Sequence, residues 1–232
     1  MDRRLFVVFA AFALMFASVA FTCGAQSVPA GAVDLGVVVT RVDGTSYKLY
    51  WAASNLSEDG LCPNPEDYGD YYAWGETKAK KDYSWNSYKW CNGSDDSLTR
   101  YNTDSSKGAV DNKTVLQASD DVAHVKLGGK WRMPTDVEWA GLKKQCTWTW
   151  TSRNGVDGYE VIGPNGKSLF LPAAGGWYNS NLLSVGSSGN YWSSSLYSDC
   201  TFDAMYVEFY SALVGRIFYY RCFGFSVRPV SE

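Results

Sequence analysis

The sequence predicts an α+β domain of short antiparallel strands with two helices and long ordered loops. Strand-like runs separated by turn signals occur towards both ends of the chain, two segments carry helix start or stop signals, and rings alternate with turn formers between them. The 232 residues suffice for one globular domain with its own core. Aromatic residues make up 16% and charged residues 19%, a composition that excludes a disordered chain.

Two hairpins and three further strands are expected. Residues 33–56 alternate between apolar and polar stretches around an Asp-Gly turn signal, and residues 158–172 hold two apolar runs joined by Pro-Asn-Gly. Pairing of the first and last strands would close the chain into one unit. The three strands near the C-terminus are expected at residues 191–194, 204–210 and 225–230.

Two helices are expected between the hairpins. The first covers residues 120–127 and ends at a Gly-Gly pair. The second begins at Thr135, because Thr135 and Glu138 have the spacing of a capping box. We therefore assign Glu138 to helix capping rather than to acid catalysis.

Residues 57–112 are expected to form long loops, because turn-forming Pro and Gly alternate there with Tyr and Trp. Such a stretch is ordered only if its rings pack on a scaffold. Two interpretations remain open. The rings lie beneath the loops as part of the core, or they form an exposed platform for carbohydrate.

Residues 1–25 are expected to be an export signal. Two arginines precede an apolar run that ends at Phe21, and small residues follow up to Ala25, after which we place the cleavage. A membrane anchor is the alternative, but the run is short for a spanning helix, and no later stretch could cross a bilayer. Lipidation at Cys23 is disfavoured by the residues before it. Residues 26–32 are then a short linker.

Charge and motif content argue against nucleic-acid binding and catalysis. The net charge is −3, and no basic block is present that could neutralise phosphates. The only histidine, His124, leaves little room for histidine-based catalysis. The serines at 193–195 are interpreted as strand residues, because a catalytic triad would need His124 beside them. We predict no enzyme activity, no cofactor and no metal site.

Thiols and loop carboxylates are the remaining reactive groups. The cysteine spacings match no zinc pattern, and the odd count after the export signal leaves at least one thiol without an intramolecular partner. These cysteines are Cys62, Cys91, Cys146, Cys200 and Cys222. Calcium binding remains an alternative, although the loop acids lack the spacing of a known calcium loop. They are Glu66, Asp67, Asp70, Asp95 and Asp96.

Five sequence blocks stand in an order that resembles a known bacterial family. They are residues 66–76 (EDYGDYYAWGE), 131–135 (WRMPT), 171–175 (LPAAG), 191–195 (YWSSS) and 224–230 (GFSVRPV). Together they are similar to the Fibrobacter succinogenes major paralogous domain, an exported family with a C-type-lectin-like fold.

The resemblance covers residues 33–230 and implies a C-type-lectin-like domain over residues 33–232, with termini that meet in one sheet. The family is related to the formylglycine-generating enzymes. The reactive cysteine and metal-binding residues of those enzymes have no match here, and neither does the calcium motif of true C-type lectins. The resemblance therefore implies neither activity.

Residues 197–225 resemble the variable region of proteins that are diversified by retroelements and that also use this fold. In those systems adenine mutagenesis turns asparagine codons into many others, but never into Trp, Met, Lys, Gln or Glu. None of these five occurs from Phe209 to Val227. The last forty residues contain ten Tyr and Phe but no Trp. Residues 213–223 match no helix or strand period, so their side chains cannot all point into one core.

We therefore predict an exported cell-surface protein that presents an aromatic face to an unknown protein or glycan on another cell, phage or host surface. A non-diversified adhesin or structural module of the cell envelope is the alternative, and a formylglycine-generating-type enzyme is the weakest. For the segment itself, an ordinary buried strand with extra aromatics remains open. The residues assigned to the binding face are Tyr197, Asp199, Phe202, Tyr206, Tyr210, Arg216, Phe218, Tyr219, Tyr220 and Phe223.

Overall fold

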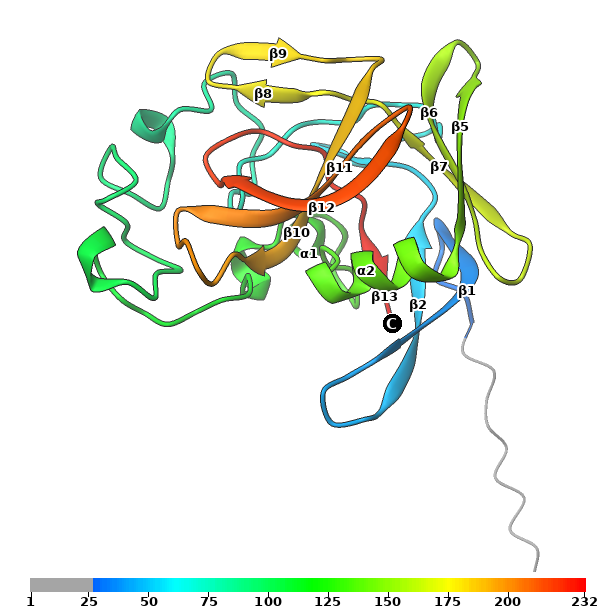
Figure 1. Cartoon of the computed structure of the whole chain (residues 1–232), viewed down its shortest axis with the longest axis horizontal. Helices are drawn as coiled ribbons and strands as arrows, with labels where there is room; N and C mark the ends of the chain where they lie inside the picture. The colour runs from blue at the N-terminus through cyan, green and yellow to red at the C-terminus, as the bar shows by residue number, and fades with distance from the viewer. Residues whose placement is uncertain (1–26) are drawn as a thin grey trace, which may run out of the picture.

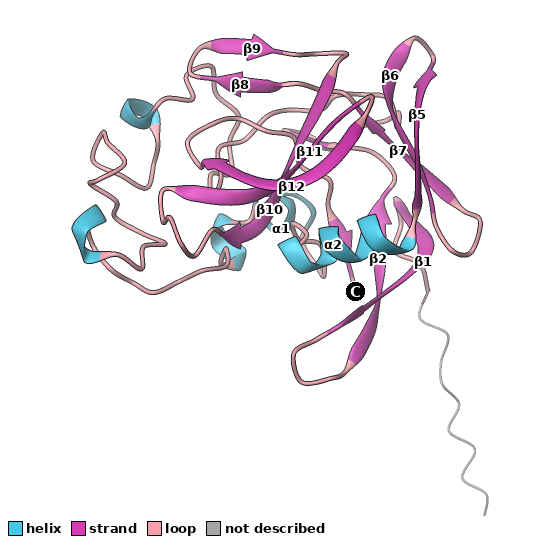
Figure 2. Ribbon diagram, in the orientation of Figure 1, coloured by secondary structure: helices cyan, strands magenta, loops and turns pink. Residues whose placement is uncertain are grey.

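The computed structural model describes residues 27–232, which form antiparallel sheets and two α-helices (Figures 1 and 2). The expected export signal at residues 1–25, with Cys23, lies outside the described residues. Within residues 27–232, no helix is both long and apolar enough to cross a membrane. The α+β class predicted from the sequence is confirmed.

The two ends of the described chain meet in one sheet. Its strands are β1 (Ala32–Thr40), β2 (Ser46–Ala52) and β13 (Val230–Ser231), in the order β1-β2-β13. The hairpin with the Asp-Gly turn is confirmed, because β1 and β2 pair across it. The last strand pairs with β2 and not with β1.

A second sheet contains the other expected hairpin. Strands β6 (Val156–Ile162) and β7 (Ser168–Pro172) pair across the Pro-Asn-Gly turn, and β5 (Thr147–Arg153) adds a strand that we did not predict. The alternating Thr and Trp of β5 have the period of two of a strand. Trp148 and Trp150 both pack edge-on against Tyr159 of β6.

Both expected helices are present. Helix α1 (Val122–Leu127) begins two residues later than predicted, because Asp121 caps it by accepting from the amides of Ala123 and His124, and a 3₁₀ turn (Ala118–Asp120) precedes it. Helix α2 (Asp136–Gln145) has the predicted capping box between Thr135 and Glu138. Glu138 is fully buried and also pairs with Arg132. Its assignment to capping is confirmed.

The third sheet is the one that carries the predicted binding segment. Its order is β10 (Ser188–Leu196), β11 (Asp203–Tyr210) and β12 (Leu213–Tyr220), so β11 is central and β12 is an edge. Helix α2 packs against this sheet on one side, and the hairpin of β8 (Gly176–Tyr178) and β9 (Asn181–Leu183) lies on the other (Figure 1). The sequence did not reveal β12 as a strand.

The strand expected at residues 225–230 is largely wrong, since only β13 at its end forms a ladder. Phe225 instead makes an isolated bridge to Tyr72, and Ser226 makes one to Tyr191. Pro229 has no amide hydrogen to continue a ladder. The segment therefore changes partner along its length and connects loops to β10 instead of extending one sheet.

The long loops are ordered by buried rings. Between β2 and α1 the regular structure consists of β3 (Leu56–Ser57), β4 (Gly60–Leu61) and 3₁₀ turns at Trp85–Ser87, Ser105–Lys107 and Ala118–Asp120. The rings supply much of one core cluster, which supports the interpretation that they lie beneath the loops rather than on a carbohydrate platform. The fully or almost fully buried rings are those of Tyr72, Trp74, Tyr83, Tyr88 and Tyr101.

The five sequence blocks named above meet around the core. The indole of Trp74 donates to the carbonyl of Ser193, and the indole of Trp192 donates to the carbonyl of Tyr72, both at 2.8 Å. Arg228 is fully buried and donates to the carbonyls of Ala52 and Phe170 as well as to a side-chain amide. These contacts join segments that are between 58 and 176 residues apart along the chain, so the blocks act as a scaffold.

Candidate functional site

The ten predicted binding residues divide by exposure. Tyr210, Phe218, Tyr219 and Tyr220 are between 39% and 45% exposed. Asp199 and Arg216 are exposed, and Tyr197 and Phe202 are half-buried. Two assignments are wrong: Tyr206 is 3% and Phe223 is 8% exposed, so neither is available to contact a ligand.

The exposure of β12 follows from its place at the edge of the sheet. Each of its residues is paired with β11 on one side only, from Leu213 opposite Tyr210 to Tyr220 opposite Asp203. Its side chains alternate between the two sides of the sheet. Because neither α2 nor the β8–β9 hairpin covers the whole strand, side chains on both sides of the sheet reach solvent. Leu213 is 46% exposed, like the rings.

Five rings form what we call the aromatic cluster: Tyr197, Phe202, Phe218, Tyr219 and Tyr220. Tyr197 and Phe218 stack with centroids 3.8 Å apart and an interplanar angle of 7°. Tyr220 packs edge-on against Phe202 at 5.8 Å and lies 5.2 Å from Tyr219. The rings therefore form two contacting groups, Tyr197 with Phe218 and Tyr220 with Phe202 and Tyr219, and within each group the rings hold one another in position.

Buried residues support the cluster from below. Phe223 stacks under Tyr219 with a centroid distance of 5.2 Å, and Tyr206 packs against Trp192 and Phe225 in the core. Of the two residues wrongly assigned to the surface, Phe223 therefore supports the cluster directly, through Tyr219 and Tyr220, and Tyr206 belongs to the core.

Arg216 is engaged by the scaffold. Its guanidinium lies 2.7 Å from a carboxylate oxygen of Asp136, the first residue of α2. This contact fixes the middle of β12 to the helix. Since the pair is partly exposed, it contributes little to stability.

Sequence reasoning missed two aromatic neighbours of the cluster. Tyr178 on β8 lies 6.5 Å from Tyr219, and Trp85 in a 3₁₀ turn lies 5.9 Å from Tyr220. Both come from segments far away in the sequence, and no local pattern indicates their proximity. They extend the aromatic cluster on two sides.

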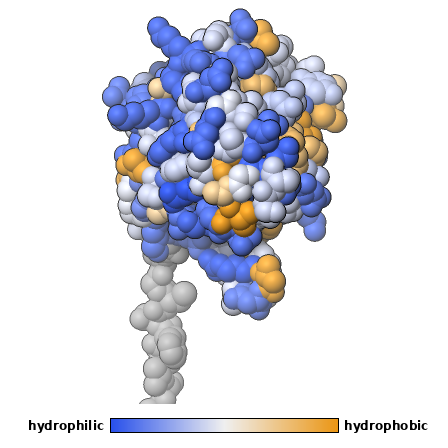
Figure 3. Space-filling model, turned by 90° about the vertical axis from the view of Figure 1, so that its left-hand side faces the viewer, coloured by the Kyte–Doolittle hydropathy of each residue, from blue (hydrophilic) through white to orange (hydrophobic). Residues whose placement is uncertain are grey.

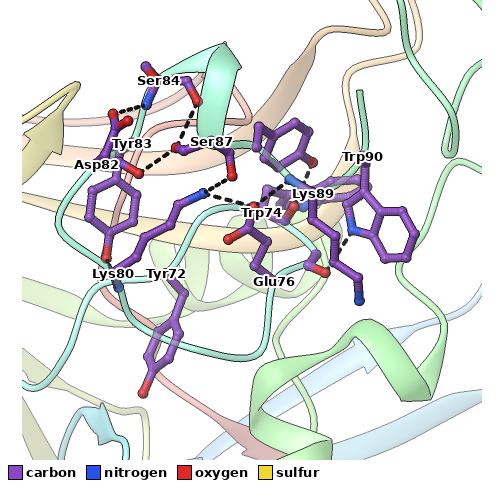
Figure 4. A network of polar contacts seen from close by, with 12 residues as sticks. Tyr72, Trp74, Glu76, Lys80, Asp82, Tyr83, Ser84, Ser87, Lys89 and Trp90 are labelled. Carbon is purple, nitrogen blue, oxygen red and sulfur yellow. Dashed lines mark hydrogen bonds and ion pairs between the residues drawn. The ribbon is translucent and has the colours of Figure 1, made fainter. Parts of the chain in front are cut away.

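The loop that contains Trp85 is held by a network of polar contacts between other residues (Figure 4). The ammonium of Lys80 donates to Glu76 at 2.9 Å and to the carbonyl of Ser87 at 3.0 Å, and Glu76 also accepts from the amide of Lys89. The hydroxyl of Ser87 in turn donates to the carbonyl of Asp82. These bonds order the loop on both sides of the tryptophan.

Two acidic side chains accompany the rings. Asp203 lies opposite Tyr220 and is 6% exposed, and burial raises its pKa to about 6. The same burial, with the carboxylate of Asp203 adding to it, raises the pKa of the Cys200 thiol to about 11. Glu208 is half-buried on the opposite side of the sheet, and burial raises its pKa as well.

The other reactive groups lie in structural roles. The hydroxyl of Ser193 donates to the carbonyl of Met205 within the sheet, and His124 lies on α1 with its Nδ1 3.2 Å from the carbonyl oxygen of Trp131. Glu66 pairs with Arg153. Within residues 27–232, no group of three or more His, Cys, Asp and Glu side chains could hold a metal ion.

A separate cavity of about 360 Å³ lies beside α1. Its lining includes His124, Trp131, Arg132 and Glu232. None of the predicted binding residues lines it. On the loop side of the molecule, Figure 3 shows a mainly hydrophilic surface with small, separate hydrophobic patches.

Comparison with known proteins adds no relative. No family model matches the chain, and no curated protein and no solved structure is significantly similar to it.

Proposed function

We propose that this chain is an exported, cell-surface ligand-binding protein with a C-type-lectin-like fold, and that the aromatic cluster on β12 and the β10–β11 loop is its binding surface. The ligand is a protein or glycan on another cell, phage or host surface. The export signal and the family resemblance in the sequence support the location and the fold.

One observation carries the proposal of binding. Five large side chains of the β11–β12 hairpin are exposed, whereas all ten tryptophans are buried or half-buried. They are Tyr210, Leu213, Phe218, Tyr219 and Tyr220. Exposed rings in contact with each other cost the folded state hydrophobic stabilisation that their burial would give. Rigid Tyr and Phe side chains provide contact area at low entropic cost when a partner covers them.

The surface is tested with arrays of glycans and of cell-surface proteins. We expect a ligand to bind the wild type, and the double variant Tyr219→Ala, Tyr220→Ala to bind it at least about tenfold more weakly, because two central contact rings are lost. The matched control is Val38→Ala, Val42→Ala, which removes exposed apolar side chains from the β1–β2 hairpin. Unchanged binding by the tyrosine variant, or equal loss in the control, would place the site elsewhere.

We further propose that the exposed positions of residues 197–225 are diversified by a retroelement. The absence of Trp, Met, Lys, Gln and Glu from Phe209 to Val227 supports this origin. A search of the flanking DNA tests it. We expect a reverse transcriptase and a near-identical template repeat that differs at adenines, and a locus without such a repeat would refute the proposal.

A non-diversified envelope adhesin or structural module is the second candidate. It shares the exposed cluster but predicts uniform sequences from Tyr197 to Phe225 in sister strains. An enzyme of the formylglycine-generating type has the least support, because burial is the main cause that raises the pKa of each of the five thiols in residues 27–232. Thiols with raised pKa are poor nucleophiles at neutral pH.

A further inference from the structure

Glu208 lies at the centre of β11, on the side of the sheet that faces away from α2 and towards the β8–β9 hairpin. Its cross-strand neighbours are Asn190 on β10 and Gly215 on β12. Gly215 has no side chain to cover the carboxylate, and a Cβ placed there would meet only atoms at 3.7 Å or more. The side of Glu208 towards β12 is therefore open.

No basic residue neutralises Glu208. Within residues 27–232 its side chain takes part in none of the ion pairs or hydrogen bonds. Some other buried carboxylates have a cation, as in the pairs of Glu76 with Lys80, Glu138 with Arg132 and Asp136 with Arg216, whereas Asp203, like Glu208, takes part in none of the ion pairs within residues 27–232. A half-buried carboxylate without a counter-ion is unfavourable, and burial raises its pKa.

Tyrosine rings lie on the same side of the sheet as this carboxylate. Tyr178 and Tyr219 lie edge-on to each other at 6.5 Å, and the phenol of Tyr178 accepts a hydrogen bond of 3.4 Å from the amide of Asn190, next to Glu208. Tyr206 lies two residues away on the same side of β11. Ring faces attract cations through their quadrupole, and the carboxylate attracts them through its negative charge. The rings and the carboxylate therefore both favour a positively charged ligand.

We propose that Glu208, on the side of the sheet that also carries Tyr178 and Tyr219, receives an arginine or lysine side chain of a protein ligand. The inference rests on the proposed function and specifies the partner: a protein surface with an exposed basic residue. The aliphatic stem of that residue would lie against Tyr219, and its charged group would pair with Glu208. The net charge of −3 favours the approach of such a surface.

The test uses the full chain with ¹³C-labelled glutamate and two probes, N-acetyl-arginine methylamide and its neutral citrulline analogue. The resonance of Glu208 is identified by its loss in Glu208→Gln. We expect the arginine probe to shift this resonance saturably and to lower the pKa of the carboxyl, while citrulline has no effect. In Glu208→Gln the arginine probe should bind about tenfold more weakly, as for a lost charge-assisted contact.

Two further variants separate the role of the ring from that of the charge. Tyr219→Leu keeps apolar area but loses the π face, so we expect it to bind the arginine probe several-fold more weakly than Tyr219→Phe. The control Asp59→Asn removes one negative charge at an exposed turn and should leave binding unchanged. Equal binding of citrulline and arginine, or full affinity in Glu208→Gln, would overturn the inference.

Failure of this inference differs from failure of the proposed function. A ligand found on the arrays that loses affinity with Tyr219→Ala, Tyr220→Ala but not with Glu208→Gln would leave the binding surface in place and refute the basic-residue site. A glycan ligand that loses affinity with Tyr219→Ala, Tyr220→Ala but not with Glu208→Gln would also leave the binding surface in place and refute the basic-residue site.

Discussion

Strands β11 and β12 are neighbours of equal length, eight residues each, yet they differ in how far their side chains are exposed. Every residue of β11 except Tyr210 is buried or half-buried, while five of the eight residues of β12 are exposed. Both strands are rich in aromatics. The difference shows that aromatic content does not decide burial here, whereas position in the sheet does.

The physical reason is the number of neighbours. Strand β11 has β10 on one side, β12 on the other, α2 against one side of the sheet and core rings against the other. Strand β12 lacks a strand at its outer edge. An edge strand can change its side chains at little cost to the core, and three matched pairs of variants test that statement.

The largest effect is expected from two phenylalanines on these strands. Phe209 is fully buried and packs against Tyr191, Tyr159 and Trp150, so Phe209→Ala should cost about 3–5 kcal/mol in free energy of unfolding. Phe218→Ala should cost about 1 kcal/mol, since Phe218 is 42% exposed and mainly loses its stack on Tyr197. Urea denaturation of both variants provides the measurement. If Phe209→Ala and Phe218→Ala lowered the free energy of unfolding by similar amounts, position in the sheet would not explain the difference between the two strands.

The next effect concerns two arginines that are five positions apart. Arg221 is fully buried and donates to the carbonyls of Tyr101 and Arg100, both at 2.8 Å. Arg221→Met leaves two buried acceptors unpaired and should cost about 2–4 kcal/mol. Arg216→Met removes only a partly exposed ion pair and should cost about 0–1 kcal/mol. An Arg221→Met protein as stable as wild type would mean that the desolvation of the buried charge outweighs its hydrogen bonds.

The smallest effect is a dependence on pH. The folded-state pKa of Asp203, about 6, lies above its ordinary value of 3.8, so the folded protein binds more protons than the unfolded chain between these values. Asp203 therefore lowers stability above about pH 6 and stops doing so as the pH falls towards 4. Asp203→Asn should raise the free energy of unfolding at about pH 8 by on the order of 1 kcal/mol and flatten its dependence on pH. Glu160→Gln on β6, where the carboxylate accepts a hydrogen bond from the hydroxyl of Ser168, is the control. An unaltered profile in Asp203→Asn would assign the dependence to other groups.

Local signals predicted much of the fold. Turn residues placed both hairpins, and the box of Thr135 and Glu138 placed α2, because hairpin turns and helix caps depend on neighbours in the chain. Strand β12 was not predicted from the sequence, because the residues of an exposed edge strand need not alternate between apolar and polar. The strand expected at residues 225–230 was wrong because its hydrogen bonds go to separate distant segments, which no local pattern reveals.

The candidate site was predicted in outline only. Its position on the β10–β12 segment came from composition, and six of the ten residues assigned to it are exposed. The burial of Tyr206 and Phe223 depends on strand register and on rings from other segments. The proximity of Tyr178 and Trp85 arises only from folding, so sequence reasoning could not include them.

The end of β12 is anchored by residues that leave no room for change. Gly224 lies so close to Tyr83 that an added Cβ would stand 2.5 Å from the ring, and Arg221 binds the loop at residues 100–101. At the other end of the strand, β11 turns into it after only two residues. Substitutions at exposed positions in between that do not contact one another should thus be nearly additive and have little effect on folding. Changes at the exposed positions of the hairpin therefore alter the surface of the protein with little effect on its free energy of unfolding.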